Sequence, residues 1–330
     1  MAPPSPFVAP STSSTSTGPD LAQRWAVLVN GQSGPTAKRA DRNRALRRHL
    51  APRSEYFETY SLAELDAAAQ QIRQGRFGTV AIAGGDGTVG QSLAALWRHC
   101  PPNEPLPLIA LLRGGTMNTI ARSLGITGNA SPAARLQALQ RAPMPHRIQA
   151  YTTLAVGSNL GFLFSSGIMY GFLDAYYATG QGALPAAKLL LHAMGSVTVN
   201  GPLAQRLAQR FTARLTLDGE STPTAENLLL VGAGTVPQVG LGFRPFPLAQ
   251  PGAQCFHVLT YGGSLQGLLR GLPRLAVGQG HKLKGARSRA CHELTLSHET
   301  PLPYALDGDL YRNPGPETTL RCGPPVRFLL

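Results

Sequence analysis

The chain has 330 residues, of which 43% are hydrophobic and only 14% are charged. This composition supports two folded domains and excludes a chain that is disordered throughout. The formal net charge of +13 favours anionic partners, such as phosphorylated ligands, an anionic membrane or nucleic acid. The four cysteines lie far apart without CxxC spacing, which predicts free thiols in a cytoplasmic protein.

The first residues of the chain, 1–20, are rich in Pro, Ser and Thr and carry neither the basic nor the apolar region of a signal peptide. They predict a disordered leader. Further along, no uninterrupted run of about 18 apolar residues occurs, so we expect no transmembrane helix.

Four short apolar runs alternate with stretches typical of helices in the first part of the chain. The runs are residues 24–30, 54–60, 77–83 and 106–112. This alternation predicts βαβ units around a parallel sheet. One helix has a clear start, because Ser61 and Glu64 have the spacing of a capping box. We therefore expect residues 21–147 to form an α/β domain.

The pattern changes after residue 147, where short strand-like runs are separated by Gly and Pro. The predicted strands are residues 146–157, 161–167, 210–219, 227–234, 255–262 and 291–298. Two helices are predicted among them, at residues 170–179 and 185–196. We therefore expect residues 148–309 to form a mostly antiparallel, β-rich domain.

Three glycine-containing segments directly follow strands of the predicted parallel sheet, at residues 30–34 (NGQSG), 83–88 (AGGDGT) and 113–118 (RGGTMN). Ligands of such sheets bind at the carboxyl ends of the strands, so the segments are expected to meet at one site. Glycines let the backbone approach an anion closely. Asp86, however, would repel a phosphate unless a cation or a proton transfer lies between them. The alternative is a turn aspartate that hydrogen-bonds its own backbone.

The motifs together identify a family resemblance. GGDGT at residues 84–88, followed about thirty residues later by GTMN at 115–118, resembles the diacylglycerol kinase catalytic domain. This family includes bacterial lipid kinases, sphingosine kinases and ceramide kinases. NGQSG at 30–34 resembles the N-P-x-S-G loop of the family, and LDGD at 306–309 resembles its D-G-E motif. The resemblance covers the chain from about Arg24 to its end.

The resemblance implies a fold and an activity. The fold is an α/β nucleotide-binding domain with a parallel sheet, as in NAD kinases and lipid kinases, plus a mostly antiparallel β-sandwich domain. Part of residues 310–330 is expected to return to the first domain. The activity is transfer of the γ-phosphate of ATP, with Mg²⁺, to a hydroxyl group of a diacylglycerol- or sphingosine-like lipid.

The resemblance also implies roles for individual residues. The residues expected to bind ATP are Asn30, Gly31, Ser33, Gly34, Thr59, Gly84, Gly85, Asp86, Gly87, Thr88, Gly115, Thr116 and Asn118. Asp86 and Asp307 are expected to hold Mg²⁺. Asp309 occupies the position of the acid proposed as the catalytic base in the family, with Asp307 and Asp86 as further catalytic candidates. A simple β-turn remains the alternative for this DGD sequence.

Three positions depart from the family pattern. Asp309 is one methylene shorter than the glutamate of the family, and Gly90 and Gln91 stand where relatives commonly have Asn and Glu. The loss of these two side chains is expected to weaken the polar support of the GGDGT loop. A relative that binds nucleotide or lipid with weakened turnover therefore stays open as an alternative.

The remaining expectations concern other activities and partners. An NAD kinase shares GGDGT and the two-domain plan, but GTMN fits the lipid branch better. No nucleic-acid recognition module is visible, so no nucleic-acid partner is expected. An apolar stretch at residues 161–180, a helix at 184–197 and a basic run at 281–290 suit a lipid substrate and peripheral docking on an anionic inner membrane face. Ordinary core packing is the alternative for the apolar stretch, and a solvated strand face is the alternative for the basic run. A homo-oligomer is left open.

Overall fold

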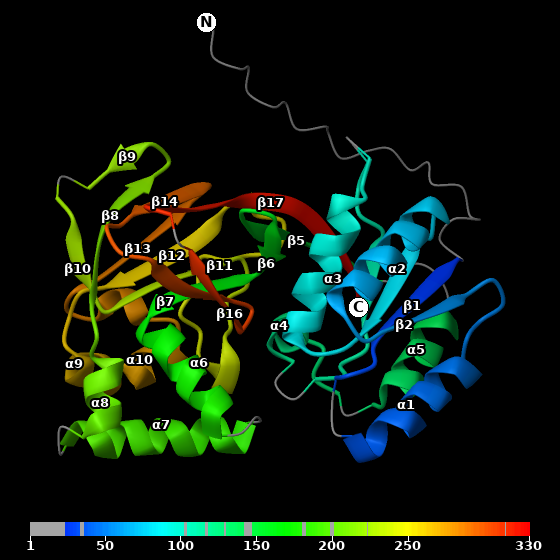
Figure 1. Ribbon diagram of the computed structural model, residues 1–330, viewed down its shortest axis with the longest axis horizontal. Coiled ribbons are helices and arrows are strands. Elements are labelled where there is room, and N and C mark those ends of the chain that lie inside the picture. Colours follow the sequence, from blue (N-terminus) through cyan, green and yellow to red (C-terminus); the bar gives the residue numbers. More distant parts are fainter. Residues whose placement is uncertain are drawn as a thin grey trace, which may run out of the picture.

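The computed structural model describes most of the chain (Figure 1). The described residues are 24–33, 36–101, 104–115, 118–128, 130–141, 147–179, 183–198, 201–222, 224–313 and 315–330. The predicted leader, Gly34 and Thr116 lie outside them.

A parallel sheet forms the centre of the first half. Its strands are β1 (Trp25–Asn30), β2 (Glu55–Thr59), β3 (Thr79–Ala83) and β4 (Leu108–Leu111), in the order β2-β1-β3-β4. Its helices are α1 (Thr36–Arg48), α2 (Leu62–Gln74), α3 (Asp86–Arg98), α4 (Thr119–Ser123) and α5 (Pro132–Arg141). The four predicted strands and their parallel arrangement are confirmed.

Both faces of this sheet are covered, because side chains alternate along each strand. Leu28 of β1 packs in a cluster with residues of α2 and α3, whereas Val27 and Val29 pack in a second cluster with residues of α1 and α5. Helices on both faces leave the strand ends as the open edge of the sheet.

The predicted capping box at the start of α2 is half formed. Glu64 N donates to Ser61 Oγ at 3.2 Å, as expected for an N-cap. The carboxylate of Glu64 accepts a hydrogen bond from Tyr60 N at 2.7 Å instead of from the amide of Ser61. The helix start is therefore predicted correctly, while the return contact lies one residue earlier.

The second half consists mainly of antiparallel strands with helices inserted between them. The strands are β5 (Ile148–Val156), β6 (Asn159–Gly161), β7 (Leu163–Gly167), β8 (Phe211–Leu217), β9 (Glu220–Ser221), β10 (Glu226–Leu228), β11 (Leu230–Gly234), β12 (Phe256–Tyr261), β13 (Ala286–Cys291), β14 (Glu293–Ser297), β15 (Leu302–Leu306), β16 (Asp309–Asn313) and β17 (Glu317–Leu329). The helices are α6 (Ile168–Thr179), α7 (Ala183–Thr198), α8 (Pro202–Leu207), α9 (Leu265–Arg270) and α10 (Leu272–Ala276).

These strands form a sandwich of two sheets. One sheet has the order β13-β12-β11-β7-β15-β16, and the other contains β10, β8, β14, β17, β5 and β6. An apolar core lies between them, with side chains such as Phe164 and Phe256 from one sheet and Leu294 and Leu320 from the other. The mostly antiparallel β-sandwich expected for this half is confirmed.

Strand β17 connects the two halves (Figure 1). It pairs antiparallel with β14 and β5, and near its end Phe328 pairs in parallel with Ile109 of β4. The parallel sheet of the first half and one sheet of the sandwich are therefore parts of one 11-stranded sheet. Among the described residues, no helix is long and apolar enough to cross a bilayer.

Candidate active site

Two glycine-rich loops are in direct backbone contact at the carboxyl ends of β3 and β4. Gly114 N donates to Gly84 O at 2.9 Å. A Cβ atom on Gly115 would lie 2.3 Å from Cα of Gly85, and one on Gly114 would lie 2.9 Å from N of Gly84. No side chain fits between the loops, so glycine is required at these positions.

The loop that follows β1 is attached to both of the others. Asn30 Nδ2 donates to Thr88 Oγ1 at 3.0 Å, and Ser33 Oγ donates to Gly114 O at 3.3 Å. Arg42 of α1 fixes the same loop from behind, because its guanidinium group donates to the carbonyl oxygens of Asn30 and Ser33. The three predicted loops therefore form one polar surface.

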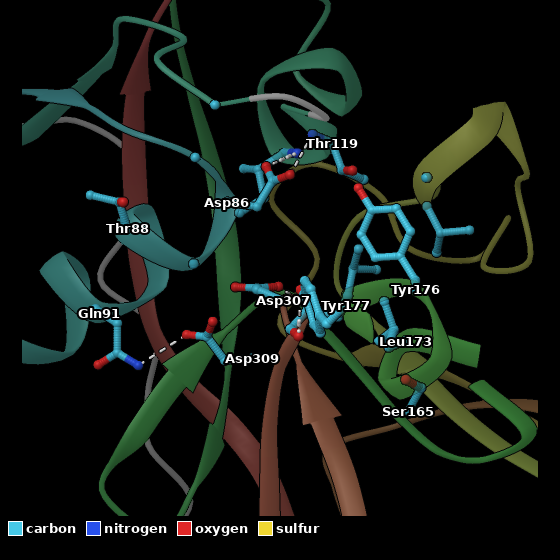
Figure 2. A pocket seen from close by; sticks show the side chains of 18 of the residues that line it. Asp86, Thr88, Gln91, Thr119, Ser165, Leu173, Tyr176, Tyr177, Asp307 and Asp309 are labelled. Carbon is cyan, nitrogen blue, oxygen red and sulfur yellow. Dashed lines mark hydrogen bonds between the residues drawn. The ribbon is translucent and has the colours of Figure 1, made fainter. Parts of the chain in front are cut away.

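Asp86 uses its carboxylate to hold the start of α4 (Figure 2). Oδ2 accepts a hydrogen bond from Thr119 N at 2.8 Å, and Oδ1 accepts one from Ile120 N at 2.9 Å. Burial raises the pKa of Asp86, while these two amides and the positive charge of Arg122 act in the opposite direction. The carboxylate is thus neither a lone charge nor bonded to its own turn, since its partners are 33 and 34 residues away.

Asn118 closes the loop between β4 and α4. Its backbone is in the left-handed region, with φ 48° and ψ 46°. Its side chain accepts from Gly115 N at 3.2 Å and donates to Gly115 O at 2.7 Å. Both polar groups of the amide are therefore used within the loop, which fits a role in loop shape.

A tight hairpin turn brings Asp307 and Asp309 to the same place. Asp307 and Gly308 both have positive φ, 50° and 96°, and Leu306 pairs with Asp309 across the turn, as in a type I′ turn. Oδ1 of Asp307 accepts hydrogen bonds from the amides of Phe162 and Leu163, each at 2.9 Å. The β-turn alternative thus describes the local geometry, and the catalytic and metal-binding roles of the two carboxylates stay predictions.

The hairpin packs against the first turns of α3. Gln91 Nε2 donates to Asp309 Oδ2 at 3.1 Å and to the hydroxyl oxygen of Tyr311 at 2.9 Å. A Cβ atom on Gly87 would lie 2.8 Å from Oδ1 of Asp309. Residues more than 200 positions apart in the sequence are therefore in contact at this site.

The three carboxylates crowd one another electrostatically. Burial raises the pKa of Asp307 to about 8, and the negative charges of Asp86 and Asp309 add to this rise. Burial also raises the pKa of Asp309, while the hydrogen bond from Gln91 lowers it. Such an excess of negative charge favours a cation between the carboxylates. Within the described part of the chain, no three His, Cys, Asp or Glu side chains are grouped so that they alone would hold a metal ion.

These residues line a cleft of about 1170 Å³ between the two halves of the molecule. The α/β half contributes mostly polar groups from its loops, and the β-rich half contributes mostly apolar side chains (Figure 2). The apolar side chains include Met169, Phe172 and Leu173 of α6, Leu190 of α7, Leu259 of β12 and Leu275 of α10. A large cleft with a few polar groups at one side is typical of a site for a partly apolar ligand.

The cleft includes most, but not all, of the predicted site residues. Those that line it are Asn30, Ser33, Thr59, Gly85, Asp86, Gly87, Thr88, Gly115, Asp307 and Asp309. Gly31, Gly84 and Asn118 do not line it and act on loop shape, while Gly34 and Thr116 lie outside the described residues. Contact of any of these residues with a nucleotide stays a prediction.

Sequence reasoning missed three residues of the cleft. Arg39 of α1 lines the polar side of the cleft. Helix α1 carries several arginines, and the sequence does not show which of them faces the cleft. Tyr177 of α6 donates to Gly308 O at 2.9 Å, and Gln91 holds Asp309. The amide of Gln91 bonds to a carboxylate of the hairpin and not to the GGDGT loop, so the expected weakening of that loop's polar support stays a prediction.

The chain is similar in sequence and in fold to diacylglycerol kinases. Residues 24–148 match the family model of the diacylglycerol kinase catalytic domain. The crystal structure of a diacylglycerol kinase from Bacillus anthracis str. Sterne has a TM-score of 0.62 at 15% identity, covering 93% of this chain and 96% of that chain. A second structure from this organism, provisionally assigned as a diacylglycerol kinase, has a TM-score of 0.66 at 16% identity, covering 93% and 97%.

At such identities, the two structures show a shared fold. No curated protein matches the chain in sequence. The family model matches the chain in sequence, and the matched residues contain the three loops and the first five helices. Residues 24–148 therefore match the diacylglycerol kinase catalytic domain, and the chain shares its fold with these two structures.

Proposed function

We propose that this protein is an ATP-dependent lipid kinase that transfers the γ-phosphate to a hydroxyl group of a diacylglycerol- or sphingosine-like lipid. The observation that carries the proposal is the cleft, which joins a polar surface of glycine loops and carboxylates to a wall of apolar side chains. A phosphate donor suits the first part and an acyl chain suits the second.

The polar side supplies what a triphosphate needs. The backbones of Gly85, Gly87 and Gly115 line the cleft without side chains, and Arg39 lines it as a cation. Phosphoryl transfer depends mainly on positioning and on neutralising charge. We therefore assign the phosphate groups to this surface, which the glycine backbones and Arg39 line.

The carboxylates fit a magnesium ion that arrives with ATP. Mg²⁺ is commonly held by one or two carboxylates together with phosphate oxygens and water, so a complete protein cage is not needed. Asp86 and Asp307 would hold it. Each oxygen of Asp86 accepts one amide, and Oδ2 of Asp307 accepts only the longer hydrogen bond from Phe162 N, so these three oxygens each keep a lone pair. When bound, the ion neutralises charge on the phosphates.

Asp309 is the residue that accepts the proton of the lipid hydroxyl. It lines the cleft where the hairpin meets α3, between the glycine loops and the apolar wall (Figure 2). A lipid alcohol is a very weak acid, so the base is needed late in the transfer, as the new bond to phosphorus forms. Burial raises the pKa of Asp309 and makes the carboxylate a better proton acceptor.

The apolar wall orients the lipid, and α7 gives it a route from a membrane. Leu190 of α7 lines the cleft, whereas its neighbours Leu191 and Met194 are 67% and 42% exposed. One helix therefore has apolar side chains that line the cleft and others that are exposed to solvent. We assign this exposed part of α7 to contact with a lipid surface.

The proposal is tested with the purified protein, γ-labelled ATP, Mg²⁺ and separate acceptors in mixed micelles: diacylglycerol, sphingosine, ceramide, phosphatidylglycerol, and NAD in solution. We expect label in a lipid alcohol and none in NAD. Asp309→Asn should lower kcat by roughly 10²–10⁴-fold while ATP still binds. The matched control is Asp41→Asn, because Asp41 is exposed on α1. Label in NAD would overturn the proposal in favour of an NAD kinase-like activity, and ATP binding without any transfer would favour a binding relative.

A further inference from the structure

We propose a second binding site, for the phosphate group of a small molecule or of a lipid, in a pocket of about 360 Å³ that is lined by residues of α4, α5 and β5. The pocket shares no lining residue with the cleft. Helix α4 lies between the two, because Thr119 and Ile120 at its start line the cleft, whereas Ser123 at its end lines the pocket. The inference is therefore independent of the proposed kinase function.

Two arginines line the pocket, and the described residues that line it include no Asp or Glu. They are Arg135 of α5 and Arg147, which directly precedes β5. Nε of Arg135 donates to Leu111 O at 2.7 Å, but its Nη2 group is buried and has no hydrogen-bond partner within the described part of the chain. A buried donor without a partner costs free energy, and more so when it carries a charge. An anion in the pocket would therefore stabilise this arrangement.

The nearest charge to Arg135 is another cation. Arg113, in the loop after β4, acts on Arg135 as a like charge, and burial together with this neighbour lowers the pKa of Arg135. Arg113 donates to Gly128 O, while its Nε group is buried without a partner among the described residues. Two guanidinium groups in a partly buried place attract an anion. Arginine suits phosphate in particular, because its planar group can donate two parallel hydrogen bonds to phosphate oxygens.

The start of β5 adds neutral donors to the same pocket. Gln149 and Tyr151 line it and lie two residues apart, on one face of the strand. Tyr151 is only 3% exposed, yet its hydroxyl group makes no hydrogen bond to another described residue. Its ring packs edge-on against Phe328 of β17, with 6.3 Å between the ring centroids, which holds it in place. A phosphate group has several acceptor oxygens and can use all of these donors.

The size of the pocket indicates what carries the phosphate. Ligand pockets commonly have about 300–1,000 Å³, and this one has about 360 Å³. It therefore accommodates a phosphate with a small attached group, such as glycerol. Such a ligand is either a soluble phosphate monoester or the headgroup of a lipid that carries a terminal phosphate.

Calorimetric titration of the purified protein with glycerol 3-phosphate, and separately with inorganic phosphate, tests the site at constant ionic strength. We expect Arg147→Gln to weaken binding about tenfold or more, because a hydrogen bond from a charged group is lost. Tyr151→Phe should weaken binding about two- to tenfold and should fold normally, since the hydroxyl group has no partner among the described residues. The matched control is Arg141→Gln, at an exposed position of α5 outside the pocket, which should bind like the wild type.

Sedimentation with phosphatidylcholine vesicles that contain phosphatidate, compared with phosphatidylcholine alone, tests the lipid source. Losses in Arg147→Gln and Tyr151→Phe identify a soluble ligand when they occur with glycerol 3-phosphate, and a lipid headgroup when they occur only with phosphatidate vesicles. Either result supports the site.

Equal binding of every probe by the wild type and both pocket variants, or no binding of any probe, would overturn the inference. A loss in Arg39→Gln, which changes the cleft, without a loss in the pocket variants would also overturn it, because the phosphate would then bind in the cleft. None of these measurements uses transfer from ATP, so a failure of the kinase proposal leaves them unaffected.

Discussion

The two walls of the cleft are built in different ways. The α/β wall consists of backbone held at fixed distances, with Gly85 and Gly115 so close that no side chain fits between them. The β-rich wall consists of apolar side chains, such as those of Phe172 and Leu173, that pack by volume. Close backbone contact permits one residue type, whereas apolar packing accepts many of similar size. The polar wall therefore has a recognisable sequence, and the apolar wall does not.

The hairpin of β15 and β16 is the exception, since it brings polar chemistry from the β-rich half. Asp307 and Asp309 lie on a tight turn and face α3 of the other half. Their place depends on long-range packing, although the turn itself is local. At this hairpin, polar side chains of the β-rich half are in direct contact with the α/β half.

The largest effect on folding and nucleotide binding should come from a side chain placed between the glycine loops. Gly115→Ala puts a methyl group 2.3 Å from the backbone of Gly85, so the loops must move apart. Overpacking of this kind costs about 1–3 kcal/mol of the free energy of unfolding. We also expect at least about a tenfold loss of nucleotide affinity, equal to about 1.4 kcal/mol. Thermal unfolding and titration with a fluorescent ATP analogue measure the two effects.

The matched control is Gly128→Ala, because a Cβ atom there has nothing within 4 Å. Unfolding temperature and nucleotide affinity of this variant should equal those of the wild type. Equal nucleotide affinity in Gly115→Ala and wild type would show that the loops do not form the phosphate surface.

A charge in the apolar wall should separate the lipid from the nucleotide. Leu173→Asp removes an apolar contact in the cleft and is expected to raise KM for a long-chain lipid about 10-fold or more, since burial of a leucine is worth about 1.5–3 kcal/mol. KM for ATP should stay the same. Leu248→Asp, at an exposed position outside the cleft, is the control. A rise in KM for ATP instead would contradict the division of the cleft into two walls.

The exposed part of α7 should matter only at a lipid surface. Leu191→Asp with Met194→Asp is expected to reduce binding to anionic vesicles by about tenfold, because two apolar side chains no longer enter the interface. Sedimentation with phosphatidylglycerol vesicles measures this binding. Turnover of a short-chain lipid in detergent micelles should change little. Unchanged vesicle binding would remove α7 from the membrane contact.

The smallest effect should be a pH-dependent gain in stability from Asp307→Asn, measured without Mg²⁺. The pKa of Asp307 is raised to about 8 in the folded protein, so its contribution to stability is complete below its unfolded pKa and is lost as pH rises through 8. The asparagine keeps an oxygen for the amides of Phe162 and Leu163.

Scanning calorimetry at several pH values measures this effect. We expect equal unfolding temperatures below about pH 4, the usual pKa of an aspartate, and a variant that becomes more stable than the wild type as pH rises, by at least about 2–4 °C at pH 9. A wild-type protein that is more stable than the variant at pH 9 would show that the carboxylate is not strained by burial and by its neighbours.

Local patterns predict much of this molecule. The four parallel strands follow from short apolar runs between helices, and the start of α2 follows from Ser61. The three loops meet because the carboxyl ends of parallel strands share one edge. Ten of the predicted site residues line the cleft for this reason, or because they lie on the DGD turn.

The rest depends on contacts between distant residues. Asp86 caps a helix that begins 33 residues later, and Gln91 holds an acid 218 residues away. No spacing rule relates such positions, because only the packing of the hairpin on α3 brings them together. Arg39 could not be predicted for a different reason. Helix α1 carries several arginines, and only the fold determines which of them faces the cleft.

The claim that one cleft serves both substrates is tested most directly by photolabelling with a diacylglycerol that carries a diazirine in its acyl chain. We expect mass spectrometry to find the label on peptides of α6 and α7, and we expect Leu173→Asp to reduce it. An ATP analogue that cannot be hydrolysed should leave the label in place, because the two ligands occupy different walls. Label outside the cleft, or complete displacement by the analogue, would contradict the account.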